Sequence, residues 1–360
     1  MTGRTRTVAA VAGTIVLAVA TVSTLFAMMM HYDRHTGDSS TTSARHTVGN
    51  KQKPTDAASG PAPKVGPGSL PSTGFSYLGV YEGSDTSVGQ YAAVEQFAQA
   101  VGRHPNLVLL YSSWGEPFAI YFAQTALQYG ATLVIDIDPT STSCAAIAAG
   151  QQDAFLQSYA QSVKAFGHPV IISFGHEMNG NWYPWGWTHT QPAMFVQAWR
   201  HVVDVFRQAG ANNVTWLWTI NSVNPSEGPI ADYWPGSSYV TWVALDAYYY
   251  FPHDNFTGVF GSTIAAIRQV TSKPILISET AIGQVTGQEE NIPGLFAGVS
   301  TSGLLGFIWF DVAQDSGIYH QDWRLEGHPD AVAAFRTAVA AYLGNGVSVS
   351  GRTPGPAVGK

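Results

Sequence analysis

The sequence is poor in charge and in cysteine, and both shortages exclude classes of function. Only 11% of its 360 residues are charged, and the formal net charge is −7. The region after residue 72 has no cluster of Lys and Arg, which excludes nucleic acid as a partner because phosphate binding needs such a cluster. The single cysteine, Cys144, cannot form an internal disulfide and lacks the spacing of a zinc site. We interpret Cys144 as a passive thiol.

One long uncharged run stands near the N-terminus. Residues 8–30 are 23 apolar or weakly polar residues, enough for a helix to cross a hydrocarbon layer of about 30 Å. Arg4 and Arg6 precede the run and favour a cytoplasmic N-terminus. No convincing A-x-A cleavage site precedes His31, so residues 1–30 are either an uncleaved membrane anchor or a cleaved signal peptide. Both interpretations export the rest of the chain, secreted or anchored to the outer face of the cytoplasmic membrane.

The composition divides the remaining chain into three parts. Residues 31–72 are rich in Ser, Thr, Gly, Pro and Lys, which predicts a disordered linker because such a segment buries little apolar surface. Residues 345–360 have a similar composition and predict a disordered tail. Residues 73–344 are then the folded domain, with a length that suits one α/β barrel.

Short apolar runs alternate with helix-like segments through this domain. The runs are nearly continuous in apolar residues, as expected for strands that are covered on both faces. The helix-like segments repeatedly end in Gly, at Gly102, Gly130, Gly167 and Gly210, which is typical of a helix C-terminus. The eight predicted strands are 75–83, 106–115, 131–139, 169–178, 213–221, 239–250, 273–283 and 303–311, and a last helix is predicted over 329–343.

Eight strand–helix units over about 250 residues predict a (β/α)8 TIM barrel. A doubly wound open sheet is the alternative, but no glycine-rich phosphate loop follows the first predicted strand. Catalytic residues of a barrel lie at the C-terminal ends of its strands, so the residues that end each run are candidates. They are mostly acids and aromatics: Tyr81, Glu82, Trp114, Glu116, Asp136, Asp138, His176, Glu177, Asn179, Trp218, Asn221, Asp246, Tyr248, Tyr249, Tyr250, Glu279, Trp309 and Asp311.

Glu177 and Glu279 end the fourth and seventh runs, and such a pair can hydrolyse a glycosidic bond. One carboxyl protonates the departing oxygen while the other attacks the anomeric carbon. The aromatic segment 182–187 would then lie at the surface and stack on sugar rings, which predicts a polysaccharide partner. Asp136 and Asp138 could hold a calcium ion, but two acids are weak support, and we predict no metal and no cofactor.

Two other functions fit the same pattern of residues. A non-catalytic cell-surface protein could bind glycan with the same aromatic residues. A Schiff-base aldolase would need a lysine at a strand end, and the predicted strand ends contain none.

The segment HEMNGNWYPWGW, 176–187, resembles the acid/base motif of glycoside hydrolase family 26, whose best-known members are endo-β-1,4-mannanases. This resemblance implies a retaining (β/α)8 enzyme that uses double displacement, with Glu177 as acid/base and Glu279, in ISETAIG, as nucleophile. It also implies that Tyr248, in Asp246-Ala247-Tyr248, hydrogen-bonds the nucleophile. Residues with a supporting or substrate-binding role are then His176, Asn179, Asp246, Trp182, Trp309 and Trp114, with Trp309 as a floor for the sugar at the −1 subsite.

The resemblance implies an endo-acting enzyme on a β-linked polysaccharide, with β-1,4-mannan as first choice. Many mannanases carry an arginine just before the motif, where this chain has Ile172-Ser173-Phe174. The family's β-1,3-1,4-glucanases and xylanases therefore stay open as alternatives. We expect a monomer that meets a membrane only through residues 8–30, if that segment is uncleaved.

Overall fold

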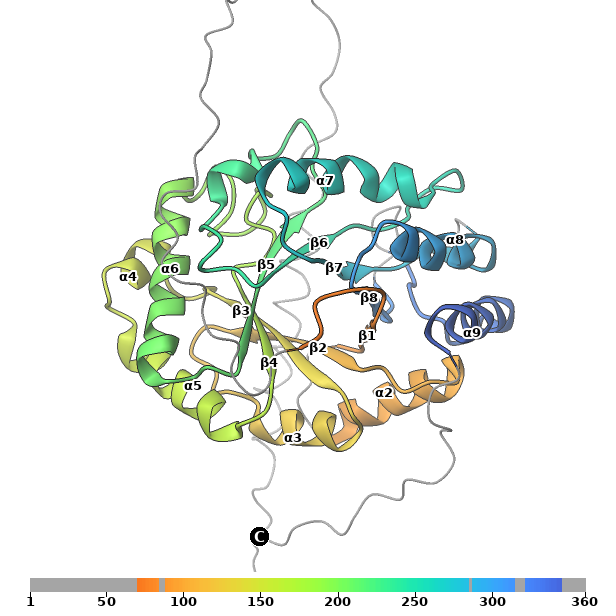
Figure 1. Ribbon diagram of the computed structural model, residues 1–360, viewed down its shortest axis with the longest axis horizontal. Coiled ribbons are helices and arrows are strands. Elements are labelled where there is room, and N and C mark those ends of the chain that lie inside the picture. Colours follow the sequence, from red (N-terminus) through yellow and green to blue (C-terminus); the bar gives the residue numbers. More distant parts are fainter. Residues whose placement is uncertain (1–69, 84–87, 285–286, 315–320, 345–360) are drawn as a thin grey trace, which may run out of the picture. The chain divides into compact units, whose positions relative to one another are not determined.

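The computed structural model describes residues 70–83, 88–284, 287–314 and 321–344. Within them, eight parallel strands close into a barrel in chain order, and helices surround the strands (Figure 1). The predicted TIM barrel is therefore confirmed. The predictions for residues 1–30, for most of the linker 31–72 and for the tail 345–360 lie outside the described residues. No helix in the described part of the chain has the length and apolarity needed to span a membrane.

Each predicted strand contains one strand of the barrel. The pairing is parallel throughout, and it closes where the first strand pairs with the last, Tyr77 beside Gly306 and Tyr81 beside Phe310. The strands are β1 (Tyr77–Tyr81), β2 (Leu107–Ser113), β3 (Thr132–Asp138), β4 (Val170–Phe174), β5 (Val214–Asn221), β6 (Trp242–Asp246), β7 (Ile275–Thr280) and β8 (Gly306–Phe310).

Helices occupy the connections, although the sequence pattern did not predict all of them. The long α8 was missed because its apolar residues are weakly periodic and Pro293 interrupts them. After β5 a short 3-10 helix stands where the other connections place an α-helix. The helices are α2 (Val88–Val101), α3 (Ile120–Gln128), α4 (Cys144–Ala148), α5 (Asp153–Phe166), α6 (Pro192–Ala209), η1 (Ile230–Tyr233), α7 (Phe256–Val270), α8 (Gln288–Thr301) and α9 (Pro329–Leu343).

The predicted glycine stops are confirmed. Gly102, Gly130, Gly167 and Gly210 all have positive φ, between 71° and 81°. Glycine takes this left-handed conformation without the steric cost that a Cβ brings. Gly167 and Gly210 directly cap α5 and α6. Each helix can therefore end and let the chain turn back into the next strand.

The strands are buried on both faces, as their continuous apolar sequences predict. All five residues of β4 and all six of β7 are buried. The ladder is irregular at the C-terminal ends of β6 and β7, where the register shifts after Leu245 and between Ile277 and Thr280. Such irregularities re-aim side chains at the end of a strand. Here they occur beside Asp246 and Glu279, so the fold departs from regularity where the candidate residues stand.

Candidate active site

Glu177 follows β4 on an unusual stretch of backbone. Its φ is +52°, in the left-handed region that non-glycine residues rarely adopt. The Glu177 amide donates a hydrogen bond of 3.1 Å to the carbonyl of Thr219 on β5, and the Gly180 amide donates one of 2.9 Å to the Glu177 carbonyl. These two bonds hold the backbone in place. The carboxyl group is thereby fixed at the C-terminal end of the barrel.

Trp182 contacts the Glu177 carboxylate directly. Its indole Nε1–H donates a hydrogen bond of 2.8 Å to Glu177 Oε2. This contact needs glycine at position 180, because a Cβ there would lie 2.3 Å from Trp182 Cζ2. The Gly180-Asn181-Trp182 stretch of the motif thus folds the indole back onto the acid that precedes it.

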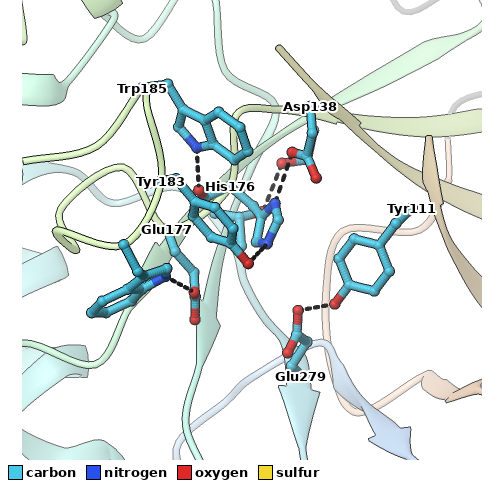
Figure 2. A network of polar contacts seen from close by, with 10 residues as sticks. Tyr111, Asp138, His176, Glu177, Tyr183, Trp185 and Glu279 are labelled. Atoms are coloured by element: carbon cyan, nitrogen blue, oxygen red, sulfur yellow. Dashed lines mark hydrogen bonds and ion pairs between the residues drawn. The ribbon is translucent and has the colours of Figure 1, made fainter. Parts of the chain in front are cut away.

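Glu279, near the end of β7, accepts hydrogen bonds from two tyrosine hydroxyls, one on each carboxylate oxygen. Tyr248 donates to Oε2 at 2.6 Å, and Tyr111 of β2 donates to Oε1. Figure 2 shows Glu279 with Tyr111 on one side and Glu177 on the other. The two hydrogen bonds restrict the rotation of the carboxyl group. The predicted contact between Tyr248 and Glu279 is therefore present in the structure, and Tyr111 adds a second one.

The two glutamates stand in different electrostatic surroundings. Burial and the Glu279 charge raise the pKa of Glu177 to about 8, while the His176 charge and the Trp182 hydrogen bond oppose the rise. Glu177 is therefore mostly protonated at neutral pH. Glu279 accepts two hydroxyl donors instead. One carboxyl is thus placed to give a proton, and its neighbour is oriented by two hydroxyl donors.

His176 links Glu177 to a third acid. Its Nδ1 lies 2.9 Å from Asp138 Oδ1, and its Nε2 lies 3.1 Å from the Tyr183 hydroxyl (Figure 2). Burial alone would lower the pKa of His176, but the Asp138 charge and hydrogen bond raise it well above its usual value. A protonated imidazolium donates from both ring nitrogens, to Asp138 and to Tyr183. Its positive charge favours ionised Glu177 once the proton has left.

Two further acids lie deeper in the barrel and are almost completely buried. Burial raises the pKa of Asp136 to about 7 and raises that of Asp246 well above its usual value. Asp246 accepts a hydrogen bond from the Ser278 hydroxyl on β7. Glu177 and Glu279 keep 8% and 7% of their surface exposed, against 1% and 0% for Asp136 and Asp246. Of these four acids, Glu177 and Glu279 are the two that a ligand can reach most readily.

The described residues contain no group of three or more His, Cys, Asp or Glu side chains arranged to hold a metal ion. Asp136 and Asp138 are the pair that the sequence left as a calcium alternative. Asp138 pairs with His176, and Asp136 lies close enough for its charge to raise the pKa of that histidine.

The family model for glycosyl hydrolase family 26 matches residues 122–291, a stretch that contains both Glu177 and Glu279. Over that stretch the chain is similar to this family. The chain is 28% identical to Endoglucanase H of Acetivibrio thermocellus over 285 residues, which cover 74% of this chain and 31% of that protein.

The mannan endo-1,4-beta-mannosidase A and B of Caldalkalibacillus mannanilyticus is 30% identical over 137 residues, 36% of this chain and 24% of that protein. The chain thus spans about a third or less of the length of these relatives. Among solved structures, the catalytic domain of the GH26 endo-beta-1,4-mannanase from Bacillus sp. JAMB-750 superposes with a TM-score of 0.56 at 16% identity. The match covers 76% of this chain and 88% of that one. It supports the barrel fold.

The prediction that the aromatic residues of segment 182–187 form a surface cluster is wrong. Trp185 is 2% exposed, and its Nε1–H donates to the His176 carbonyl at 2.8 Å. Tyr183 stacks on Trp185, with ring centroids 4.4 Å apart. Trp182 and Trp187 are half-buried. The cluster mainly supports the backbone that carries His176 and Glu177, and Trp182 remains the tryptophan of this segment that touches the acid.

Trp309 does not form a floor for a sugar, which corrects another prediction. It is fully buried, and its ring lies edge-on to Phe335 of α9 at 5.4 Å. Successive residues of a strand point to opposite faces, so Trp309 faces the helices and the next residue faces the barrel interior. Phe310 stacks on Tyr81 at 4.7 Å and meets Tyr248 edge-on at 5.7 Å. Phe310 is thus a β8 ring that contacts Tyr248, the donor to Glu279.

The prediction that Trp114 binds the substrate is wrong for a similar reason. It is 8% exposed, it packs on Phe155 of α5 at 4.8 Å, and its Nε1–H donates to Gln152 Oε1 at 3.0 Å. These contacts place the ring between strand and helix. Trp114 therefore offers no free face to a sugar.

Asn179 contacts the loop after β5. Its amide nitrogen donates to the Asn221 carbonyl at 3.0 Å and to Glu227 Oε2 at 2.9 Å. Sequence reasoning missed Glu227 because it lies inside a polar loop, and it missed Tyr111 because that residue lies within an apolar strand. The strand register supplies a signal for Tyr111, which pairs with Asp136 in the ladder.

Proposed function

We propose that this chain is an endo-acting, retaining glycoside hydrolase that cleaves a β-linked polysaccharide. The observation that carries the proposal is the pairing of Glu177, whose pKa is raised to about 8, with Glu279, whose two oxygens accept tyrosine hydroxyls. One group is a proton donor at neutral pH, and the other is an oriented nucleophile. Glycoside hydrolysis needs this division of roles between two carboxyl groups.

In the first step, Glu279 attacks the anomeric carbon while Glu177 gives its proton to the glycosidic oxygen. The bond between that carbon and oxygen breaks, the leaving sugar departs as an alcohol, and a covalent glycosyl-enzyme forms. Glu177, now ionised beside protonated His176, accepts a proton from water in the second step. The water oxygen bonds to the anomeric carbon and releases Glu279. The two steps each invert the anomeric carbon, so the product keeps its configuration. We predict that the Glu177 and Glu279 carboxyl groups are about 5–5.5 Å apart, as in retaining enzymes.

Supporting roles follow from the contacts. Tyr248 and Tyr111 hold the nucleophile ionised and aimed. His176, held by Asp138, stabilises the ionised acid/base between the two steps. Asp246 pairs with Glu279 in the ladder and joins the end of β6 to Ser278 of β7. Trp182 holds the acid and borders the cleavage point with the rest of its ring.

We propose β-1,4-mannan as the substrate, because a relative named as a mannan endo-1,4-beta-mannosidase shares 30% identity over the stretch that aligns. A mixed-linkage β-glucan is the second candidate. It is favoured by the longer match to Endoglucanase H and by Ile172-Ser173-Phe174 in place of the arginine. Xylan is a third candidate of the same family.

The deciding assay measures reducing-sugar release from mannan, lichenan and xylan by the wild type and by Glu279→Ala. We expect the wild type to act on one polymer by internal cleavage, which lowers its viscosity early. Glu279→Ala should be inactive on all three and should melt at the wild-type temperature. Binding without sugar release by the wild type would instead support a non-catalytic glycan-binding protein.

An NMR spectrum of the first products tests retention, because the new reducing end should appear as the β-anomer before mutarotation. Initial formation of the α-anomer would show inversion and contradict a covalent step on Glu279. We also propose that the enzyme acts outside the cytoplasm, secreted or anchored through residues 8–30. N-terminal sequencing of the exported protein distinguishes cleavage from anchoring.

A further inference from the structure

Glu227 is a carboxylate that the proposed chemistry does not use, and its surroundings are elaborate. It lies in the loop between β5 and η1 and is half-buried. Three asparagine amides donate to it: Asn221 to Oε1 at 2.9 Å, Asn224 also to Oε1, and Asn179 to Oε2 at 2.9 Å. With three donors, the Glu227 carboxylate is held in position more firmly than the carboxylate of an ordinary solvated glutamate.

The three asparagine donors leave one hydrogen-bonding position free on the Glu227 carboxylate. A carboxylate has about four lone-pair sites for hydrogen bonds, two on each oxygen. Oε1 already accepts from two amides, and Oε2 accepts from Asn179. Glu227 Oε2 can therefore accept one further hydrogen bond without losing any that hold it.

The loop that carries Glu227 is fastened to the segment that carries the acid/base. The Gly228 amide donates to the Asn179 carbonyl at 2.8 Å. Gly228 also lies against the Trp187 indole, where a Cβ would approach to within 2.6 Å of the ring. Asn179 itself follows Glu177 by two residues. The Glu227 carboxylate is thus held at a fixed place beside Glu177.

Electrostatics agree with this placement. Burial and, next, the charge of Glu177 raise the pKa of Glu227, while the three asparagines lower it. While Glu177 holds its proton it carries no charge, so the second of these causes is absent and the three amide donors favour the ionised form of Glu227. In a glycosidase the acid/base touches the oxygen that belongs to the leaving sugar, whereas the nucleophile touches the sugar that stays. A fixed acceptor beside the acid/base therefore lies next to the leaving sugar, which carries hydroxyl donors.

We propose that Glu227 accepts a hydrogen bond from a hydroxyl of the leaving sugar and so forms part of the +1 subsite. This inference rests on the proposed hydrolase function. It makes Glu227 a substrate-binding residue that helps in cleaving polysaccharide and in transferring a glycosyl group to an added sugar. It has no part in reactions whose leaving group is not a sugar.

The test compares two substrates in Glu227→Gln. A glutamine carbonyl in the place of Oε1 keeps the Asn221 and Asn224 bonds, while its NH2 group replaces the acceptor Oε2. The first substrate is the polymer that the wild type hydrolyses, and the second is an aryl β-glycoside of the same sugar, whose leaving group is a phenol. Glu289→Gln, the same change at an exposed residue of α8, is the matched control.

We expect kcat/KM on the polymer to fall about 10- to 100-fold in Glu227→Gln, the range for losing a hydrogen bond to a charged group. Hydrolysis of the aryl glycoside should stay within about twofold of the wild type, as should both activities of Glu289→Gln. Equal losses on the two substrates, or no loss on the polymer, would overturn the proposal. Equal losses would show that Glu227 acts only by holding the loop or Glu177.

A second measurement does not depend on how much of the variant folds. With the aryl glycoside as donor and a free sugar as acceptor, the ratio of transfer product to hydrolysis product reports binding at the +1 subsite. This ratio should fall about tenfold or more in Glu227→Gln, since the lost hydrogen bond holds the acceptor. An unchanged ratio would refute the role. A wild type without activity on any polymer or aryl glycoside would refute the hydrolase function itself, and the two failures are therefore distinct.

Discussion

Trp182 donates its indole N–H to the carboxylate of Glu177 at 2.8 Å, five residues back along the chain. The hydrogen bond favours the ionised form of an acid whose pKa burial raises to about 8. Without it the carboxyl would release its proton less readily. Trp182 therefore limits the rise of the pKa of Glu177.

This contact predicts a shift in the pH profile. In the wild type, kcat/KM should fall as the pH rises through about 8, because Glu177 must be protonated to give its proton away. Trp182→Phe keeps an aromatic cover but loses the donor, so the alkaline limb should move to higher pH. KM for the polymer should rise as well. An alkaline limb that stays in place or moves down would contradict this role, and Trp234→Phe, at another half-buried tryptophan, is the control.

Removing either of the two tyrosine hydroxyls that bind Glu279 should lower the activity to a similar degree. Tyr111→Phe and Tyr248→Phe each remove one hydroxyl donor from the nucleophile, and each should lower kcat by about tenfold or more, since a hydrogen bond to a charged group is worth about 1.5–3 kcal/mol. The double variant should lose more than either single variant, because the two hydroxyls bind different oxygens. Tyr121→Phe, at a tyrosine of α3 that is 82% exposed, is the control. Full activity of Tyr111→Phe would remove that residue from the mechanism.

The barrel and the two glutamates were predictable from the sequence because both depend on local patterns. Continuous apolar runs produce buried parallel strands, and residues that follow those runs stand at one end of the barrel. Glu177, Glu279 and Tyr248 are placed by this rule, and so is His176.

The direction of individual rings was not predictable in the same way. Trp309 and Phe310 are neighbours in one strand, and only the closed register shows that the second one faces the interior. Tyr111 reaches Glu279 across 168 positions of the chain. Glu227 finds its three asparagines only after the loop has folded. Contacts of this kind depend on tertiary packing, which a single sequence does not display.

Leaving-group chemistry separates the roles of the two acids. Glu177→Ala lacks the proton donor, so polymer hydrolysis should fall by about 10²–10⁴, the usual contribution of general acid catalysis. An aryl glycoside with a nitrophenol leaving group needs little protonation, and its first step should stay fast. A burst of nitrophenol followed by slow turnover is the expected trace. Glu279→Ala should show no burst, and a burst from that variant would contradict its role as nucleophile.

The last prediction concerns stability and arises at the junction of β1 and β8. Burial and the neighbouring Asp311 raise the pKa of Glu82 to about 10, and burial raises that of Asp311 to about 6. Protonated Glu82 shares a hydrogen bond with Asp311, and Asp311 Oδ1 also accepts from the Trp309 indole at 3.1 Å and the Leu325 amide at 2.8 Å. The native state thus holds protons that the unfolded chain releases at lower pH.

The free energy of unfolding should therefore decrease as the pH rises, because the native protein binds more protons than the unfolded chain. The contribution is complete below pH 4.5, the usual pKa of Glu, and is lost as the pH approaches about 10. Each proton contributes a slope of up to about 1.4 kcal/mol per pH unit. Glu82→Gln keeps a donor to Asp311 without the titration, so its melting temperature should exceed that of the wild type at pH 9 and match it near pH 5. Thermal unfolding followed by circular dichroism at both pH values tests this, with Glu289→Gln as control, and parallel curves for wild type and Glu82→Gln would contradict the shared proton.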